Sequence, residues 1–144
     1  MSHSEFGPVG DDETLIRVII SPIHINPKTS LPSPAAFASR DLMERGLSVL
    51  RRDYLNDREL KRQGQLLCKD RPERSMQGCM VGSARAVRAL RDREDRKAFC
   101  VVDDEQPDQP MHATVMRSAD QNELAIKELR GELMEIFGYQ VAED

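Results

Sequence analysis

The chain has 144 residues, of which 39% are hydrophobic, 32% charged and 4% aromatic. This length suits one domain with a single core, and no apolar run approaches the roughly 18–20 residues that a membrane span needs. The three cysteines, Cys68, Cys79 and Cys100, form no paired motif. They favour free thiols and argue against a secreted disulfide scaffold.

The charge is distributed unevenly. Residues 1–39 sum to −2, residues 40–97 to +6 and residues 98–144 to −8, which together give the net charge of −4. The simplest interpretation is that the basic middle segment pairs with the acidic C-terminal segment of the same chain. The alternative is an anionic partner, either a nucleic acid or the acidic face of another protein.

The first element follows a polar start. Residues 1–12 are acidic, predict a disordered arm and lack the pattern of a signal peptide, so we expect a cytoplasmic protein. The β-branched run from Leu15 to Ile20 predicts a buried strand near 14–20, which Pro22 ends. Residues 22–34 contain four prolines and predict a loop, and Ser33 followed by Pro34 predicts a short helix.

Residues 41–55 fit either a helix or a strand. The apolar spacing in this segment is helical, whereas Gly46 interrupts it and the following residues can start a strand. We favour a strand near 46–51. Asn56 followed by Glu59 then indicates a helix start of the capping-box type, with the helix continuing to about residue 67.

The second half of the chain predicts three strands and two helices. We expect strands near 78–82, 98–102 and 112–116, the last two as a hairpin, and a helix that Ser83 caps. Asp120 and Glu123 indicate the start of a final helix near 120–137, which Gly138 ends. Residues 13–140 therefore predict a single α+β domain with a small, mostly antiparallel sheet, the last helix packed across it, and residues 141–144 as a tail.

Two histidines and an arginine suggest phosphate chemistry. His24 and His112 are each expected near a strand end, where sites often gather, and Arg40 lies between them in the sequence. If the three converge in one pocket, one imidazole can act as base, the other as acid, and Arg40 can neutralise developing charge. The simpler alternative is that each histidine satisfies a backbone group at its strand end.

The sequence favours neither a metal nor a cofactor. Cys79, Cys100 and His112 have spacings too wide and irregular for a structural zinc site. The acidic cluster from Asp103 to Asp108 lacks the ligand spacing of a calcium loop. Because no Gly-rich nucleotide motif is present either, we expect no cofactor.

Arg85, Arg88 and Arg91 follow the spacing of one helix face. This arginine stripe can be a solvated surface, can face an acidic protein, or can follow the phosphates of a nucleic acid. Aromatic residues that would stack on bases are missing from it, and the chain is acidic overall, so a nucleic acid is the least favoured of the three.

Two stretches of the sequence resemble a group of known proteins. One runs from Phe37 to Val49 and includes Leu47-Ser48-Val49; the other runs from Val101 through Asp103 and Asp104 to Pro110, His112 and Ala113. Together they resemble small uncharacterised bacterial proteins with an aspartate-rich turn followed by a Pro-x-His-Ala-like step. The resemblance implies a bacterial source and a strand–turn–strand feature, and it implies no activity. Glu105 stands where that group has proline.

From these observations we favour a non-catalytic accessory protein that binds a protein partner through its charged faces and that can also associate with its own copies. The first alternative is a small enzyme acting on a phosphate-bearing substrate through His24, Arg40 and His112. The second is a nucleic-acid binder that uses Arg85, Arg88 and Arg91. No membrane association is expected.

Overall fold

The computed structural model describes residues 5–142. Its main sheet contains β1 (Thr14–Ser21), β4 (Leu47–Arg51), β5 (Ser75–Ser83), β6 (Phe99–Asp103), β7 (His112–Arg117) and β8 (Gly138–Val141). The helices are α1 (Ser39–Met43), α2 (Asp57–Leu67), α3 (Ala84–Ala89) and α4 (Glu123–Ile136), with 3₁₀ turns η1 (Pro34–Phe37) and η2 (Arg52–Tyr54). A small hairpin joins β2 (Ile25–Asn26) to β3 (Leu31–Pro32).

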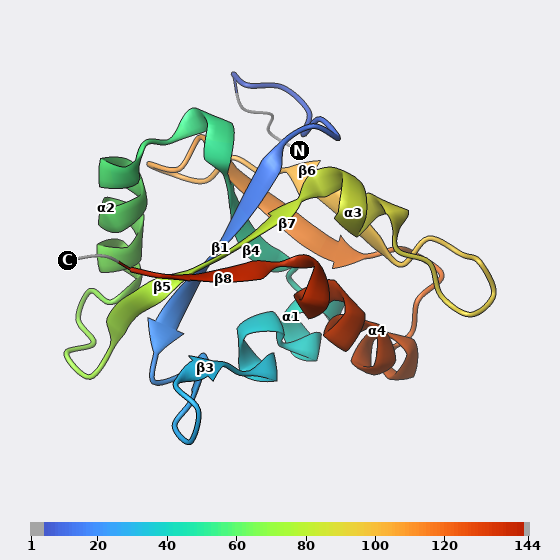
Figure 1. Cartoon of the computed structure of the whole chain (residues 1–144). Coiled ribbons are helices and arrows are strands. Elements are labelled where there is room, and N and C mark those ends of the chain that lie inside the picture. Colours follow the sequence, from blue (N-terminus) through green and yellow to red (C-terminus); the bar gives the residue numbers. More distant parts are fainter. Residues whose placement is uncertain (1–4, 143–144) are drawn as a thin grey trace.

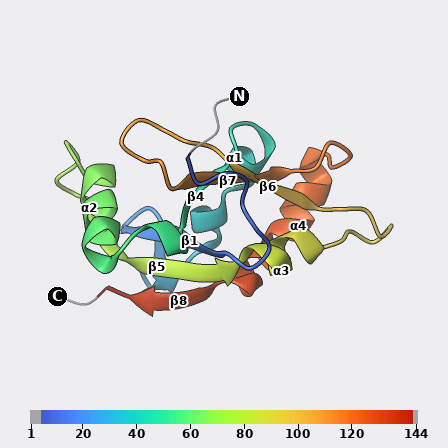
Figure 2. The same cartoon turned by 90° about the horizontal axis from the view of Figure 1, so that it is seen from above.

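The main sheet is antiparallel, with strand order β6-β7-β4-β1-β5-β8. Figure 1 shows α2 on one side of this sheet and α1 and α4 on the other, and Figure 2 shows β8 along its outer edge, next to β5. The expected α+β fold, with the last helix packed on the sheet, is confirmed.

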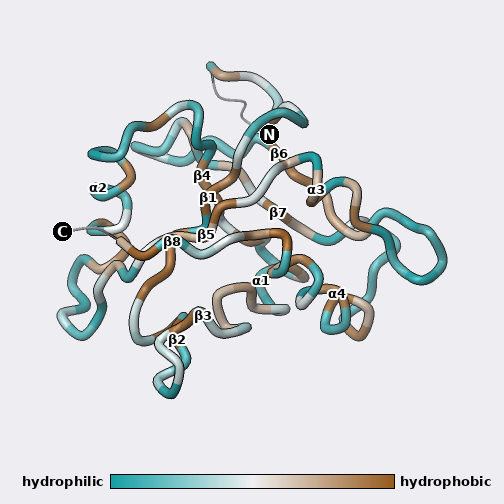
Figure 3. Tube along the Cα trace, viewed as in Figure 1, coloured by the Kyte–Doolittle hydropathy of each residue, from teal (hydrophilic) through white to brown (hydrophobic). Residues whose placement is uncertain are grey.

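Both faces of the central strand β1 are covered by core residues. Leu15 and Ile19 point into the larger core beneath α1, α3 and α4, whereas Ile16 and Val18 point into the smaller core beneath α2. Because successive side chains of a strand point to opposite faces, a strand covered on both faces needs the nearly continuous apolar run found in β1. Figure 3 shows this pattern as hydrophobic central strands between hydrophilic loops.

Three helices begin at side-chain caps. The side-chain oxygens of Asn56 and Ser83 accept from the backbone N–H groups of Glu59 and Ala86 at 2.8 and 2.9 Å, as the sequence predicts. The cap of α4 is Asn122, which accepts from the N–H of Ala125 at 2.9 Å. The helix therefore begins at Glu123, three residues after the predicted start.

Residues 41–55 contain a helix end, a strand and a turn in succession. The helix α1 ends at Met43, Gly46 adopts a φ of +85°, and β4 follows from Leu47. The strand predicted near 46–51 is confirmed, and the helical spacing of the apolar residues in this segment has no structural counterpart.

Two chain ends differ from expectation. Residues 138–141, placed at the end of the domain and in a tail, form the edge strand β8, whose register pairs Gly138 with Val81. At the other end, residues 5–12 of the expected disordered arm pack on the fold, and the rest of the arm lies outside the described residues. Val9 is buried, and Phe6 stacks on Tyr54 with 4.0 Å between ring centroids.

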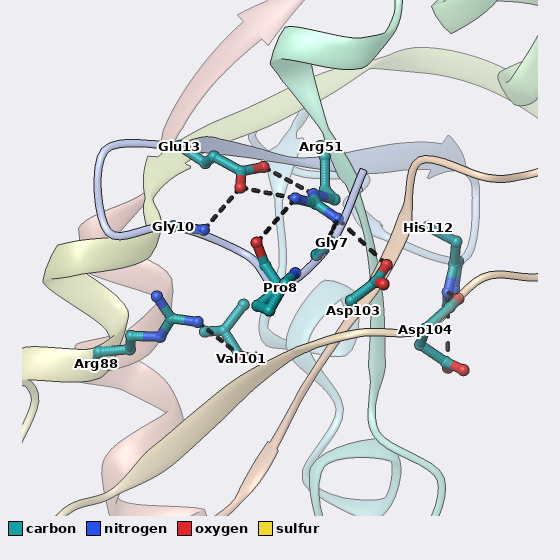
Figure 4. Close-up of polar contacts among 10 residues, drawn as sticks. All are labelled: Gly7, Pro8, Gly10, Glu13, Arg51, Arg88, Val101, Asp103, Asp104 and His112. Atoms are coloured by element: carbon teal, nitrogen blue, oxygen red, sulfur yellow. Dashed lines mark hydrogen bonds and ion pairs between the residues drawn. The ribbon is translucent and has the colours of Figure 1, made fainter. Parts of the chain in front are cut away.

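A buried arginine attaches the N-terminal segment to the sheet. Arg51 is 0% exposed, and its Nε and Nη2 donate to the two carboxylate oxygens of Glu13 at 2.7 and 2.8 Å. Nη1 donates to Asp103 at 3.2 Å and to the carbonyl of Gly7 at 2.7 Å, and Nη2 also donates to the carbonyl of Pro8 (Figure 4). All five N–H donors of the guanidinium are therefore used.

Other ion pairs are mostly local. Arg62 pairs with Glu59 and Arg96 with Asp92, both inside the basic middle segment, while Arg51–Asp103 connects that segment to the acidic C-terminal one. The arginines of the basic middle segment therefore pair mostly with acidic residues of that same segment. In residues 5–142, no helix has both the length and the apolar character needed to cross a membrane.

Candidate functional site

The two central strands of the sheet separate partway along their length. β1 pairs with β4 only at Leu15↔Arg51 and Ile16↔Leu50, whereas it stays paired with β5 along its whole length. Continuing the register would place Val18 opposite Ser48. Because the N–H of Arg51 donates to Met111 on the β7 side, the backbone groups of Leu50 and Ser48 point the other way, towards β1. The separation therefore opens a gap lined by backbone polar groups.

Arg17 spans this gap. Its Nε donates to the carbonyl of Ala36 at 2.9 Å and its Nη1 to the carbonyl of Ser48 at 3.1 Å. Nη2 has no hydrogen-bond partner among residues 5–142. Burial lowers the pKa of Arg17 to about 10 and Asp41 opposes that shift, so the guanidinium stays charged at neutral pH. The gap thus contains a cation with free donors and no carboxylate hydrogen bond.

His24 satisfies the last backbone groups of β1. Ile20 donates its N–H to Nδ1 of His24 at 3.0 Å, and its carbonyl accepts from the His24 N–H at 2.8 Å. Since Nδ1 accepts a hydrogen bond, the proton of the neutral ring lies on Nε2. His24 therefore presents an N–H donor from its second ring nitrogen.

The protonation of His24 gives a testable prediction. Burial, together with the charges of Arg17 and Arg74, lowers the pKa of His24 from its ordinary 6.5 to about 4. Between these values the unfolded chain binds a proton that the folded chain does not. The contribution of His24 to stability is therefore complete above about pH 6.5 and decreases as the pH falls towards about 4.

We expect the ring proton resonances of His24 in NMR to titrate with a midpoint near pH 4. The signal is assigned by its absence from the His24→Asn variant, in which the amide oxygen can still accept from Ile20. A midpoint at the ordinary histidine value would contradict the buried, cation-flanked placement of this ring.

His112 has the opposite tautomer. Its Nδ1 lies 2.7 Å from the carbonyl oxygen of Asp104, which can only accept, so Nδ1 carries the proton and Nε2 has a free lone pair. The carboxylate of Asp104 accepts from the hydroxyl of Thr114 at 2.7 Å, which fixes the turn that holds the ring. Figure 4 shows Asp104 beside His112, while the preceding Asp103 points to Arg51. His112 is thus oriented as a base.

The two histidines line the same hollow. We call it the apolar lobe: it has a volume of about 260 Å³ and lies between β1, β4, α2 and the loop before β7. His24, His112, Arg17 and Arg74 supply its charged and titratable groups, and among the described residues no Asp or Glu lines it. Its apolar wall consists of Ile16, Val18, Ile20, Ile23, Val49, Leu50 and Leu67.

A second hollow adjoins the first. We call it the polar lobe: it has a volume of about 390 Å³, and Asp41, Arg45, Asp104, Gln106 and Thr114 line it. Both lobes are lined by Arg17, Ser48, Gln109 and His112, which form their shared wall. We refer to the two lobes together as the cleft.

The third member of the predicted triad lies elsewhere. Arg40 is on α1 with its side chain 80% exposed, pairs with Glu44 at 3.3 Å and does not line either lobe. Of the three predicted residues, His24 and His112 therefore line one lobe and Arg40 does not, whereas Arg17 and Arg74 line it as well. A charged residue inside the apolar run of β1 was a sequence signal for Arg17, whereas no local pattern marks Arg74.

The arginine stripe is partly engaged by the protein itself. α3 ends at Ala89, so Arg91 lies beyond it and donates to the carbonyl of Arg88 at 3.0 Å. Arg88 donates to Asp11 at 2.8 Å and to the carbonyl of Val101 at 3.0 Å, whereas Arg85 is exposed. A protein partner and a nucleic acid at this surface stay predictions.

The three cysteines do not line either lobe of the cleft. Cys68, Cys79 and Cys100 are free. Within residues 5–142, no three or more His, Cys, Asp or Glu side chains gather closely enough to hold a metal ion. Cys100 instead contacts the hydroxyl of Ser118 at 3.6 Å.

Models of known protein families, curated proteins and solved structures provide no match to this chain. The resemblance of the aspartate-rich turn to small bacterial proteins stays a prediction, and function is inferred from the cleft.

Proposed function

We propose that the protein binds a small phosphate-bearing molecule in the cleft and hydrolyses its phosphoester. The observation that supports this function best is the pair of histidines with opposite tautomers in one lobe, His24 as donor and His112 as acceptor. Two arginines without a carboxylate partner among the described residues, Arg17 and Arg74, line the same lobe. A partly buried guanidinium with donors that no carboxylate uses favours an anionic ligand.

The roles of the residues follow from their protonation. Nε2 of His112 takes a proton from water as the water oxygen attacks phosphorus, and the bond to the leaving oxygen breaks. The proton then passes from His112 to that oxygen. His24 is neutral at pH 7 because its pKa is about 4, so it keeps its proton and donates a hydrogen bond to the phosphoryl oxygen that gains charge. Arg17 and Arg74 stabilise the same charge.

The test is the release of 4-nitrophenolate from 4-nitrophenyl phosphate and bis(4-nitrophenyl) phosphate at pH 7. In the His112→Asn variant the side-chain amide can still donate to the carbonyl of Asp104, but the Nε2 base is lost. We expect it to lower kcat by about 10²–10⁴-fold, the usual contribution of a positioned base. The matched control is Arg40→Ala, because Arg40 is exposed and lies outside the cleft.

Thermal unfolding of each variant separates loss of activity from loss of fold. No turnover of either ester by the wild-type protein, together with no stabilisation by inorganic phosphate, would overturn the proposal. Full activity of a folded His112→Asn variant would overturn the role of His112.

A further inference from the structure

The two lobes of the cleft differ in chemistry. The apolar lobe has a wall of aliphatic side chains that extends to its rim, where Ile23 and Leu67 are 43% and 49% exposed. Such a wall favours a flat or aliphatic group, which gains free energy when it leaves water. The free guanidinium donors and the two imidazoles lie in the same lobe.

Among the described residues, no Val, Leu, Ile, Met or Phe lines the polar lobe. Asp41 and Asp104 contribute carboxylates, Gln106 an amide, Thr114 a hydroxyl and Arg45 a guanidinium. Closely spaced donors and acceptors of this kind match a group with several hydroxyls, which can both donate and accept at each oxygen. Asp104 already accepts from Thr114 and Gln106. A purely aliphatic group would therefore leave Asp41 and Arg45 without their water and without a ligand partner.

The wall between the lobes contains two of the four residues proposed to act on phosphate, Arg17 and His112. Arg17 and His112 line both hollows, so a phosphate at this wall has one lobe on each side. A monoester has a single substituent and can fill only one lobe. A diester has two substituents and can fill both.

We infer that the substrate is a phosphodiester that joins a flat or aliphatic group, bound in the apolar lobe, to a polyhydroxylated group such as a sugar, bound in the polar lobe. This inference rests on the proposed function. In the reaction, water adds to phosphorus and one P–O ester bond breaks. The products are a phosphomonoester and an alcohol, and the proton removed by His112 is returned to the alcohol oxygen.

The experiment compares three substrates of the 144-residue chain: 4-nitrophenyl phosphate, bis(4-nitrophenyl) phosphate and the 4-nitrophenyl ester of uridine 5′-monophosphate, whose ribose has two free hydroxyls. We expect the highest kcat/KM for the last substrate. Its nitrophenyl group suits the apolar lobe, and its nucleoside suits the polar lobe. Arg45→Ala removes a charged donor from the polar lobe. It is expected to raise KM for the nucleotide ester about tenfold, the loss of one hydrogen bond to a charged group.

Two controls make the assignment specific. Arg45→Ala should raise KM for bis(4-nitrophenyl) phosphate far less than for the nucleotide ester, because bis(4-nitrophenyl) phosphate has no hydroxyls for the polar lobe. Leu67→Ser, in the apolar lobe, should raise KM for both diesters.

The outcomes separate the two proposals. If none of the three esters is hydrolysed, the proposed function itself fails. If the monoester is hydrolysed as efficiently as the nucleotide ester, or if Arg45→Ala affects both diesters equally, the protein is a phosphoesterase and the assignment of a two-part substrate is wrong.

Discussion

The Arg51→Ala variant is expected to unfold with a free energy about 3–5 kcal/mol lower than that of the wild-type protein, the usual cost of removing one member of a buried ion pair. The substitution leaves the carboxylates of Glu13 and Asp103, which are 6% and 4% exposed, without the guanidinium that both contact. Because a domain of this size has a total stability of only about 5–15 kcal/mol, the loss is a large fraction. Urea unfolding at pH 7 measures it.

The matched control is Arg40→Ala. This arginine also pairs with a glutamate, but its side chain is 80% exposed, so the change should remain within about 0.5 kcal/mol. Combining Arg51→Met with Glu13→Gln and Asp103→Asn removes the two carboxylate charges together with the guanidinium. This triple variant should recover much of the lost free energy of unfolding. If Arg51→Ala were as stable as Arg40→Ala, the buried network would not hold the N-terminal segment.

The contribution of the Arg51–Glu13 ion pair to stability decreases in acid. Burial raises the pKa of Glu13, but the hydrogen bonds from Arg51 and from the Gly10 N–H outweigh this effect, and the pKa is lowered from its ordinary value of 4.5. The pair therefore contributes its stability above about pH 4.5 and loses it as the pH falls through the lower, folded value. In the Arg51→Ala variant, low pH protonates the carboxylates of Glu13 and Asp103. The difference in free energy of unfolding between the variant and the wild-type protein should therefore become smaller as the pH falls.

Gly46→Ala is expected to lower the free energy of unfolding by about 2–5 kcal/mol. The left-handed backbone at a φ of +85° costs an L-residue about 1–2 kcal/mol, and the added methyl group would overlap Cγ2 of Thr114, at an overpacking cost of about 1–3 kcal/mol. Thr114 cannot simply turn away, because its hydroxyl is bonded to Asp104. Thermal or urea unfolding measures the loss.

The control for this change is the same substitution at Gly131. That glycine lies within α4 with nothing within 4 Å of an added methyl group. Gly131→Ala should stabilise the protein by about 0.5–1 kcal/mol, because alanine favours helices more than glycine does. Equal stability of Gly46→Ala and the wild type would show that the turn before β4 tolerates a side chain.

The elements with strong local signals could be predicted from the sequence. The cap formed by Asn56 starts α2 at Asp57, and the apolar run of β1 predicts a strand between two covered faces. The edge strand β8 could not be predicted, because a helix-ending glycine and the three residues after it form a strand only through pairing with β5. The order of the N-terminal segment likewise depends on Arg51, which is distant in sequence.

The candidate site shows the same limit. The sequence predicts His24 and His112 near strand ends, and both residues line one lobe, which leaves their role a proposal. Arg17 and Arg74 line the lobe, and Arg40 does not, because of where β1 and β4 separate. Pairing between strands that are distant in the sequence cannot be predicted from either segment alone. The sequence also could not show the tautomers, which depend on contacts with Ile20 and Asp104.

The early end of the β1–β4 pairing divides the sheet into two half-sheets of three strands, β6-β7-β4 and β1-β5-β8. Only two residue pairs join them, next to Arg51, which connects β4 to Glu13 just before β1 and to Asp103 on β6. Below this junction the two half-sheets are held together by the shared core, in which Leu15 and Ile19 pack in one cluster with Val49. The cleft lies where the two central strands are unpaired, so a ligand that contacts Arg17 and His112 would link the two half-sheets a second time.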